Sequence, residues 1–390
     1  MVTLFYIALI VLVLAELVKG LSANGTPPVL QKYAWQLDLA YFMWSNILYL
    51  RISLMAILAF LCWSMSPAEC SSVIIPTVIF GALWAFIYWL FNLYWVGKHK
   101  FDPLKNPVYA TAAQNKIPLS EQIMGVDWNG IQKAYPVSMI FYHHQVADTI
   151  SDQPIWVTYC GLCRSGRIYN VLIDGQALDF GLVGAITFNA VFKDNQTGSW
   201  WRQETGEAVK GKHSGKLLQD IPMEQMSLEN WLAKHPNSKV LQQDSKYQKI
   251  YNYLTSVMNY EASFPGWHRQ ETPRLVIGLE VDGHCRAYDW EQLQKRRMVL
   301  DSIGNKHLLL MSSEDGTSPF AYDRNVGGQV LEFEFNNNTI TDTKTHSKWN
   351  QFGQCIEGEM KGTKLGSVQI YQQFIRAWAS FHADTTYYQF

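Results

Sequence analysis

The sequence predicts a membrane anchor of about three transmembrane helices, followed by a mainly antiparallel β (α+β) soluble region made of two tandem repeats. Composition is the first observation behind this prediction: the chain is 48% hydrophobic and 14% aromatic, and only 17% of it is charged. The second is distribution, because residues 1–100 hold eight of the 65 Asp, Glu, Lys and Arg residues and the other 290 residues hold 57. The third is that motifs in the charged part occur twice in the same order.

Three apolar segments near the N-terminus predict the anchor. Val73–Val96 carries no charge and is long enough to cross a bilayer core. Residues 52–68 are also uncharged, and we expect the preceding Arg51 to extend to the membrane interface. Val2–Val18 lacks the basic start and small-residue cleavage site of a signal peptide, so we interpret it as the first of the three transmembrane helices.

Charge and composition also indicate where the protein acts. The net charge of -1 provides no basic footprint for nucleic acid, so no nucleic-acid partner is expected. We place the chain in the cell membrane as a multi-pass protein, with the membrane and membrane proteins as the expected partners. Bases that include Arg51, before the second segment, and Lys98 and Lys100, after the third, favour a cytoplasmic soluble region.

Two blocks of sequence in the soluble region resemble each other. GVDWNGIQKAYP (125–136) resembles GLEVDGHCRAYD (278–289), and TGSWWRQETGEAVKG (197–211) resembles THSKWNQFGQCIEG (345–358). The first pair contains Asn-Gly and Asp-Gly dipeptides, which are typical of β-hairpin turns. Each repeat is therefore predicted to be a string of hairpins, then a Trp-bearing loop, then one helix. The predicted domains are the transmembrane anchor (1–100), the first repeat (101–242), a Tyr-rich connector (243–271) and the second repeat (272–390).

Residues that occur in both repeats are expected to serve the shared fold. His235 and His382 occupy equivalent positions, and so do Trp201 and Trp349. We interpret all four as structural. Polar and reactive residues that occur in only one repeat are the better functional candidates.

Two cysteines and a histidine are confined to the first repeat. YCGLC supplies Cys160 and Cys163, where the second repeat has Ser313 and Gly316. His143 corresponds to an arginine in the second repeat. The C-x-x-C segment lies between two predicted strands, so both sulfurs can be directed at one point.

Thiolate and imidazole ligands predict a metal site. Thiolates bind zinc and cuprous copper, and zinc requires ligands beyond two sulfurs. His143 is the best third ligand because the chain returns from it to Cys160. We therefore expect Cys160, Cys163 and His143 to hold copper or zinc, for metal handling or electron transfer.

Two other functions remain open from sequence. A C-x-x-C pair is also the active group of thiol–disulfide oxidoreductases, so the protein could be a membrane-tethered member of that class. The many Trp and Tyr residues also suit a non-catalytic module that binds a ligand or a partner protein. No Walker, Rossmann, nucleophile-elbow or H-E-x-x-H motif occurs, so the sequence assigns no enzymatic reaction.

The motifs YCGLCRSG, DNQTGSWWRQETGEAVKG (194–211) and WLAKHPNSKVL resemble an uncharacterised prokaryotic group, domain-of-unknown-function family 3179, over about residues 120–390. The resemblance implies that Cys160, Cys163 and His143 form one cluster, and it implies no established activity. Many members of the family resemble exported proteins. Both sides of the membrane therefore stay open for the soluble region.

Overall fold

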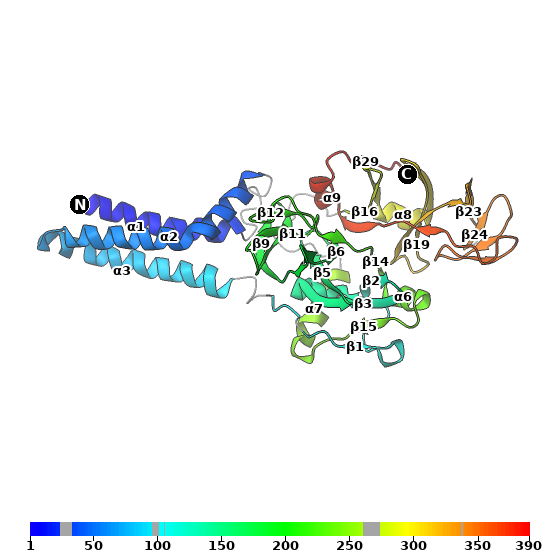
Figure 1. Ribbon diagram of the computed structural model, residues 1–390, viewed down its shortest axis with the longest axis horizontal. Coiled ribbons are helices and arrows are strands. Elements are labelled where there is room, and N and C mark those ends of the chain that lie inside the picture. The colour runs from blue at the N-terminus through cyan, green and yellow to red at the C-terminus, as the bar shows by residue number, and fades with distance from the viewer. Residues whose placement is uncertain (24–32, 96–100, 105, 260–273, 337) are drawn as a thin grey trace. The chain divides into compact units, whose positions relative to one another are not determined.

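The computed structural model describes residues 1–23, 33–95, 101–104, 106–259, 274–336 and 338–390, without the side chains of residues 255–259. The chain forms two compact units, which are described separately (Figure 1). Unit 1 contains residues 1–102, 178–203 and 207–216. Unit 2 contains residues 103–177, 204–206 and 217–390.

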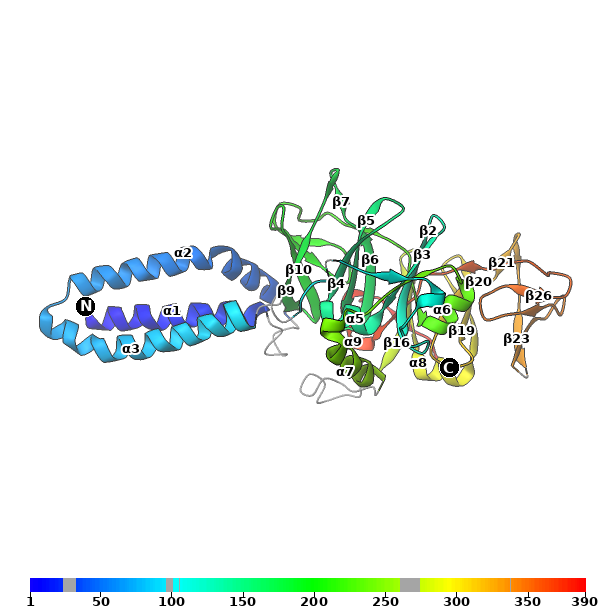
Figure 2. The ribbon, with the colours of Figure 1, turned by 90° about the horizontal axis from the view of Figure 1, so that it is seen from below.

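Within its described residues, unit 1 has three helices long and apolar enough to cross a membrane: α1 (Val2–Ala23), α2 (Trp35–Trp63) and α3 (Pro67–Trp89), which the π-helical turn η2 (Leu90–Tyr94) extends. Figure 2 shows α1 between α2 and α3. The three apolar helices are confirmed, but the limits predicted for the second one are wrong. The helix already begins at Trp35, because Asp38 is exposed on its surface and the buried Gln36 donates to the Ser22 carbonyl at 3.1 Å.

A polar cluster joins the three helices. The carboxylate of Glu16 is fully buried, and Arg51 binds it with Nη2–Oε1 and Nε–Oε2 distances of 2.5 and 2.9 Å. Asn92 donates to Glu16 Oε1 at 2.7 Å, and Lys19 bonds to the Asn92 side chain. Arg51 thus turns toward α1, not outward to an interface as expected, because a buried carboxylate needs a charged partner.

Unit 1 also contains an antiparallel sheet in the order β12-β11-β10-β9. The Trp200 ring packs edge-on against Tyr41 of α2, with ring centroids 5.3 Å apart, and Lys210 pairs with Asp38 at 2.5 Å. The domain boundaries expected from the sequence remain a prediction. In the structure, this sheet belongs to the same compact unit as the apolar helices. Its strands are β9 (Phe180–Ile186), β10 (Asn189–Asp194), β11 (Trp200–Arg202) and β12 (Ala208–Lys210).

Unit 2 begins with two sheets, in the orders β1-β15-β3-β2-β14 and β13-β6-β5-β4. The strands are β1 (Tyr109–Ala110), β2 (Gln122–Trp128), β3 (Ile131–Pro136), β4 (Gln145–Ile150), β5 (Gln153–Cys160), β6 (Ser165–Asn170), β7 (Leu172–Ile173), β8 (Gln176–Ala177), β13 (Gln219–Asp220), β14 (Glu224–Ser227) and β15 (Lys239–Leu241). The helices are η3 (Ala112–Gln114), α5 (Val137–His143), α6 (Leu228–Lys234), η4 (Ser245–Tyr247) and α7 (Gln248–Asn259). The rest of the predicted connector, residues 260–271, lies outside the described residues.

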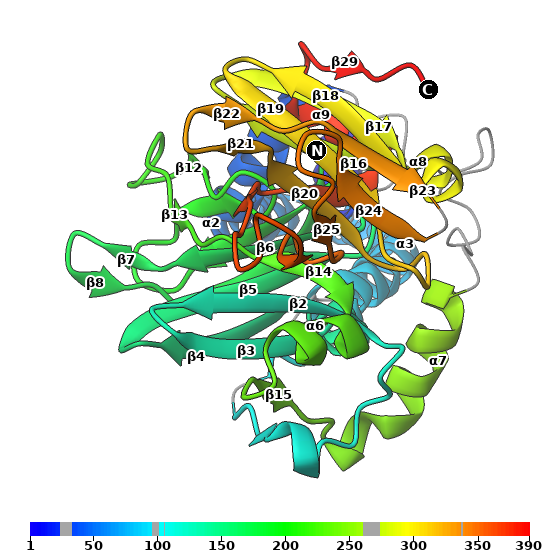
Figure 3. The same ribbon diagram turned by 90° about the vertical axis from the view of Figure 1, so that its right-hand side faces the viewer.

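The remainder of unit 2 follows a similar order of strands and helices, with sheets β28-β16-β17-β29, β18-β19-β20-β27 and β23-β24-β25-β26 (Figure 3). The strands are β16 (Leu275–Val281), β17 (His284–Asp289), β18 (Met298–Ile303), β19 (Lys306–Ser312), β20 (Pro319–Asp323), β21 (Asn325–Val326), β22 (Gln329–Val330), β23 (Phe333–Asn336), β24 (Thr339–Asp342), β25 (Lys348–Trp349), β26 (Cys355–Glu357), β27 (Gly366–Ser367), β28 (Tyr371–Phe374) and β29 (Thr386–Tyr387). The helices are α8 (Trp290–Arg296) and α9 (Ile375–Phe381).

The predicted hairpin chemistry is confirmed. Asn129 (φ 51°) and Gly130 (φ 78°) join β2 to β3, and Asp282 (φ 50°) and Gly283 (φ 76°) join β16 to β17. Positive φ at both central residues is the geometry of a type I′ turn. Most strand pairs are antiparallel, as expected, with β15–β3 and β17–β29 parallel. Trp349 lies on the short strand β25 and Trp201 on β11, so the expected Trp-bearing loops are strands.

Candidate functional site

The two cysteines of the C-x-x-C segment lie at the tight end of the β5–β6 hairpin. Cys160 is the last residue of β5 and pairs with Ser165, and the Cys163 N–H donates to the Cys160 carbonyl at 3.2 Å. Arg164 closes the turn with φ 53°, a conformation that costs a non-glycine residue about 1 kcal/mol. The turn therefore holds both cysteines on one side of the hairpin, as the sequence predicts.

The two sulfurs lie 3.0 Å apart and are not joined by a disulfide. Cys160 is 2% exposed and Cys163 is 0% exposed, so bulk water does not reach them. Two thiolates on a tetrahedral zinc ion would lie roughly 3.8 Å apart at Zn–S lengths of about 2.3 Å. A disulfide needs about 2.05 Å. The observed distance is intermediate, and approach by about 1 Å closes the disulfide without any third group.

His143 binds a different part of unit 2. Its Nε2 lies 2.5 Å from the hydroxyl oxygen of Tyr251 on α7, and its ring packs against Tyr247, with centroids 5.0 Å apart. The ring is 1% exposed. The ligand atoms of His143, Cys160 and Cys163 do not all lie within 4.8 Å of one another. The structure therefore brings the two sulfurs together and directs the histidine toward α7.

Aromatic rings and backbone surround the cysteine turn. A Cβ atom on Gly161 would lie 2.3 Å from the Phe141 ring, so only glycine fits there. The Phe374 N–H donates to the Cys163 carbonyl at 2.9 Å. Burial raises the pKa of the neighbouring Tyr159 hydroxyl, and the charge of Arg164 offsets part of that rise. The sulfurs thus lie in an apolar environment with a guanidinium close by.

The corresponding turn, between β19 and β20, is stabilised by hydrogen bonds of the Ser313 hydroxyl group. Ser313 Oγ accepts from the Thr317 and Ser318 N–H groups at 3.1 and 2.8 Å, and it donates to Asp315. The Ser313 N–H donates to the Ser318 carbonyl at 2.8 Å, which continues the strand register. All the bonds of this hydroxyl serve the loop itself.

Unit 2 also contains a polar cavity of about 430 Å³. Arg167, on β6, pairs with buried Glu204 at 2.6 Å, and its guanidinium lies 3.5 Å from the centroid of the Tyr371 ring. The Tyr371 hydroxyl donates to Asp220 at 2.9 Å. Burial raises the pKa of Asp220, and Arg167 offsets part of the rise. This buried ion pair and its neighbours were not predicted, because the residues are far apart in the sequence.

Glu280, Cys285 and His382 line the same cavity. Among the described residues, this is the group of three His, Cys, Asp or Glu side chains whose ligand atoms all lie within 4.8 Å of one another. His382 is predicted to be structural because its counterpart, His235, occurs in the first repeat. Cys285 is absent from the first repeat, so the criterion of single occurrence could have singled it out.

The fold and the cysteine turn define a class: a protein with three apolar N-terminal helices and a β-rich region that carries a buried dithiol. The chain belongs to the family described as Protein of unknown function (DUF3179), which it matches over residues 99–385. The predicted family is therefore confirmed over most of the chain. Neither a curated protein nor a solved structure matches the chain.

Proposed function

We propose that the protein is a membrane-tethered thiol–disulfide protein in which Cys160 and Cys163 form a reversible disulfide. The observation that carries the proposal is the 3.0 Å distance between the two sulfurs. A dithiol held in this arrangement loses little further conformational freedom when the bond closes, so oxidation within the pair is favoured over oxidation to another cysteine.

The proposed tether is the helical part of unit 1. Each of its three helices is long enough and apolar enough to span a bilayer core. In a bilayer, the Glu16–Arg51 ion pair would lie among the helices, where each charge neutralises the other. We propose that this multi-pass anchor keeps the soluble region at the cell membrane, beside other membrane proteins.

We also propose that the soluble region is a tandem duplication, and matching contacts support it. Asp194 accepts from Trp201 Nε1 at 2.8 Å, and Asp342 accepts from Trp349 Nε1 at 3.2 Å. A thiol pair on one hairpin and a bonded serine on the other then mark a difference acquired after duplication. The thiols are not needed to form the turn, which supports a chemical role for them.

The proposed reaction is thiol–disulfide exchange with a small-molecule disulfide as oxidant. Because both sulfurs are buried, the reaction requires the turn to open so that the small molecule reaches them. The thiolate of one cysteine then attacks a sulfur of that molecule, forms a mixed disulfide and releases one thiolate. The second cysteine then attacks its neighbour's sulfur, so that the Cys160–Cys163 bond forms and the second thiolate leaves. Two electrons pass to the small molecule, and the two protons of the cysteines end on the released thiols.

Two alternatives make different predictions. The metal hypothesis, with copper or zinc held by Cys160, Cys163 and His143, requires a His143 ring nitrogen to lie closer to the sulfurs than it does in the structure. The interaction-module hypothesis predicts that the thiols affect stability alone. Burial of both sulfurs counts against the redox hypothesis, because reactive cysteines are usually partly exposed. The short sulfur–sulfur distance favours closure of a disulfide.

The full-length protein in detergent tests the proposal. It is equilibrated in glutathione buffers that range from reducing to oxidising, and its free thiols are then alkylated. The mass of the peptide that contains Cys160 and Cys163 is measured by mass spectrometry. We expect this peptide to carry two alkyl groups after reducing buffer. After oxidising buffer it should carry none and be two hydrogens lighter than the unmodified dithiol, and reduction before alkylation should restore both alkyl groups. A pair that stays reduced in every buffer would contradict the proposal.

Cys355 provides the matched control, because it is buried and lies outside the turn. Cys355→Ser is expected to leave the redox change intact, whereas Cys163→Ser abolishes it. Metal analysis of the same samples under reducing, anaerobic conditions distinguishes the metal hypothesis. That hypothesis requires bound metal that is lost in both Cys160→Ser and His143→Ala.

A further inference from the structure

Glu280, Cys285 and His382 form a compact group of three potential ligands. Glu280 and Cys285 are directly opposite each other across β16 and β17, so their side chains share one face of the sheet. His382 is the residue that ends α9, and its Nε2 lies 4.0 Å from Glu280 Oε2. The carboxylate oxygen, the sulfur and the imidazole nitrogen lie within 4.8 Å of one another.

The imidazole of His382 is oriented as a ligand. Its Nδ1 lies 3.0 Å from the Trp378 carbonyl oxygen, and its ring stacks on the Trp378 indole with centroids 3.7 Å apart. A hydrogen bond from Nδ1 to a carbonyl leaves Nε2 unprotonated and fixes the ring plane. The free electron pair of Nε2 then points to the side where Glu280 lies.

Electrostatics in the cavity favour a cation. Its lining includes the carboxylates of Glu204, Asp220, Glu280 and Asp384 against one guanidinium, that of Arg167. Arg167 and Glu204 neutralise each other. Burial and the charges of Glu280 and Asp384 raise the pKa of the Cys285 thiol. A bound cation would reverse this effect by stabilising the thiolate.

A matched site without the thiol occurs elsewhere in unit 2. The His235 ring packs at a tilt of 41° against Trp231, and its Nδ1 lies 3.7 Å from Asp127 Oδ2. The residue opposite Asp127 is Gln132, whose amide donates to that carboxylate at 3.2 Å. The carboxylate is therefore already bonded to an amide donor where the other site has a sulfur.

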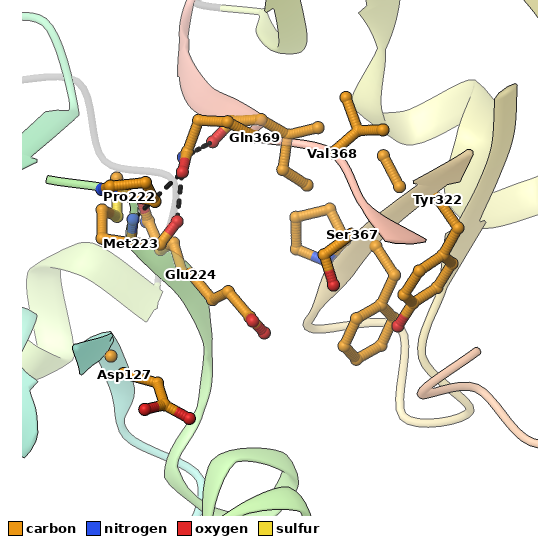
Figure 4. A pocket seen from close by; sticks show the side chains of 14 residues that line it. Asp127, Pro222, Met223, Glu224, Tyr322, Ser367, Val368 and Gln369 are labelled. Atoms are coloured by element: carbon orange, nitrogen blue, oxygen red, sulfur yellow. Dashed lines mark hydrogen bonds between the residues drawn. The ribbon is translucent and has the colours of Figure 1, made fainter. Parts of the chain in front are cut away.

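Asp127 lines a second cavity, of about 320 Å³. Figure 4 shows Asp127 and Glu224 on one side of it and Tyr322 and Ser367 on the other. The described residues that line this cavity include no cysteine and no histidine. The two cavities thus differ in the groups that bind transition metals.

We infer that Glu280, Cys285 and His382 form a binding site for a divalent transition-metal cation of the zinc class. Sulfur, nitrogen and oxygen ligands together suit zinc, and three protein ligands leave one position for water or a small anion. Zinc requires these atoms to approach one another by about 1 Å, which exposed Glu280 and half-buried Cys285 can supply by changes of side-chain rotamer. The inference goes beyond the redox function and does not depend on it.

Zinc binding to the full-length protein in detergent tests the site. The protein is stripped with a chelator under reducing conditions, zinc chloride is added alone, and affinity is measured by chelator competition. The Cys160→Ser/Cys163→Ser protein is used as the background, so that the other thiol pair contributes nothing. We expect one zinc ion per chain, and Cys285→Ser or His382→Gln to weaken affinity at least about tenfold.

Further variants keep the result interpretable. Glu280→Gln alters an exposed side chain and should fold normally, yet it should also weaken zinc binding. His235→Ala is the matched control and should retain full affinity. Cobalt added in place of zinc should produce a thiolate-to-cobalt absorption band that Cys285→Ser removes. Zinc affinity unchanged in Cys285→Ser and Glu280→Gln, or a cobalt complex without that band, would overturn the inference.

Discussion

The turn between β5 and β6 and the turn between β19 and β20 have the same strand register but different chemistry. In the second, the Ser313 hydroxyl bonds to two N–H groups of its own loop and to Asp315. In the first, two sulfurs at the corresponding positions face each other at 3.0 Å. A hairpin with this strand register therefore forms without thiols, as the β19–β20 turn shows. The thiols are therefore better explained by chemistry than by folding.

The same lesson applies to the two Trp–His pairs. Trp231 with His235 and Trp378 with His382 each place an imidazole against an indole, tilted by 41° in the first pair and stacked at 12° in the second. Only the second pair has a cysteine on the adjacent strand, at Cys285. The shared Trp residues support the fold, and at the proposed zinc site the unshared Cys285 adds a ligand beside the shared His382.

The largest expected effect on stability follows from removing a tryptophan that occurs in both repeats. Trp231→Ala and Trp378→Ala each remove a side chain that is at most 1% exposed, so each should lower the free energy of unfolding by about 3–5 kcal/mol. Denaturant unfolding followed by fluorescence measures it. Tyr387→Ala, at a position 44% exposed, is the control and should change stability by less than about 0.5 kcal/mol. A large loss in only one of the two Trp variants would contradict the shared role.

His143 and its counterpart, Arg296, should differ. His143→Ala leaves the buried Tyr251 hydroxyl without its 2.5 Å partner and should cost about 1–3 kcal/mol. Arg296 is exposed, so Arg296→Ala should cost less than about 0.5 kcal/mol. Thermal unfolding of both variants measures this. If His143→Ala instead leaves stability unchanged and removes a bound metal, the metal hypothesis is favoured.

Closing the thiol pair should stabilise the protein modestly. A disulfide that closes a loop of four residues restricts the unfolded chain by about 2 kcal/mol. The unfolding midpoint of the oxidised protein should exceed that of the reduced protein, and Cys163→Ser should show no difference between the two conditions. Equal midpoints for oxidised and reduced wild-type protein would argue against closure within this turn.

The smallest expected effect concerns Asp194 and Asp342. Burial acts to raise the pKa of Asp342, but bonds from Thr345 and Trp349 outweigh it and lower the pKa below its ordinary value of 3.8. The resulting stabilisation is present above about pH 4 and disappears as the pH falls through the lowered pKa. Asp342→Asn should therefore cost about 1 kcal/mol at pH 7 and nothing in strong acid. The stability loss of Asp194→Asn should depend on pH in the same way. Opposite pH dependence in the two variants would contradict the proposal that Asp194 and Asp342 are equivalent.

Much of the fold could be predicted because its signals are local. The apolar helices and the Asn-Gly and Asp-Gly turns depend on neighbouring residues, and the structure has them. The start of α2 at Trp35 was missed because Asp38 and Arg51 interrupt the apolar pattern, and only the fold supplies Arg51 with Glu16. The site could be predicted in part. Cys160 and Cys163 meet at one turn because they are close in the sequence, but Tyr251, the partner of His143, lies 108 residues away. Cys285 and His382 were likewise unpredictable as a group, because strand pairing and helix packing bring them together.

The most direct measurement is the redox state of the cysteine pair inside living cells. Cells are quenched in acid, free thiols are blocked, and the membrane-extracted chain is analysed by peptide mass before and after reduction. We expect some chains to contain a Cys160–Cys163 disulfide. This fraction should increase when cells are treated with a thiol oxidant and decrease when the oxidant is removed. Full alkylation of both cysteines under every condition, with the chain folded, would contradict the account.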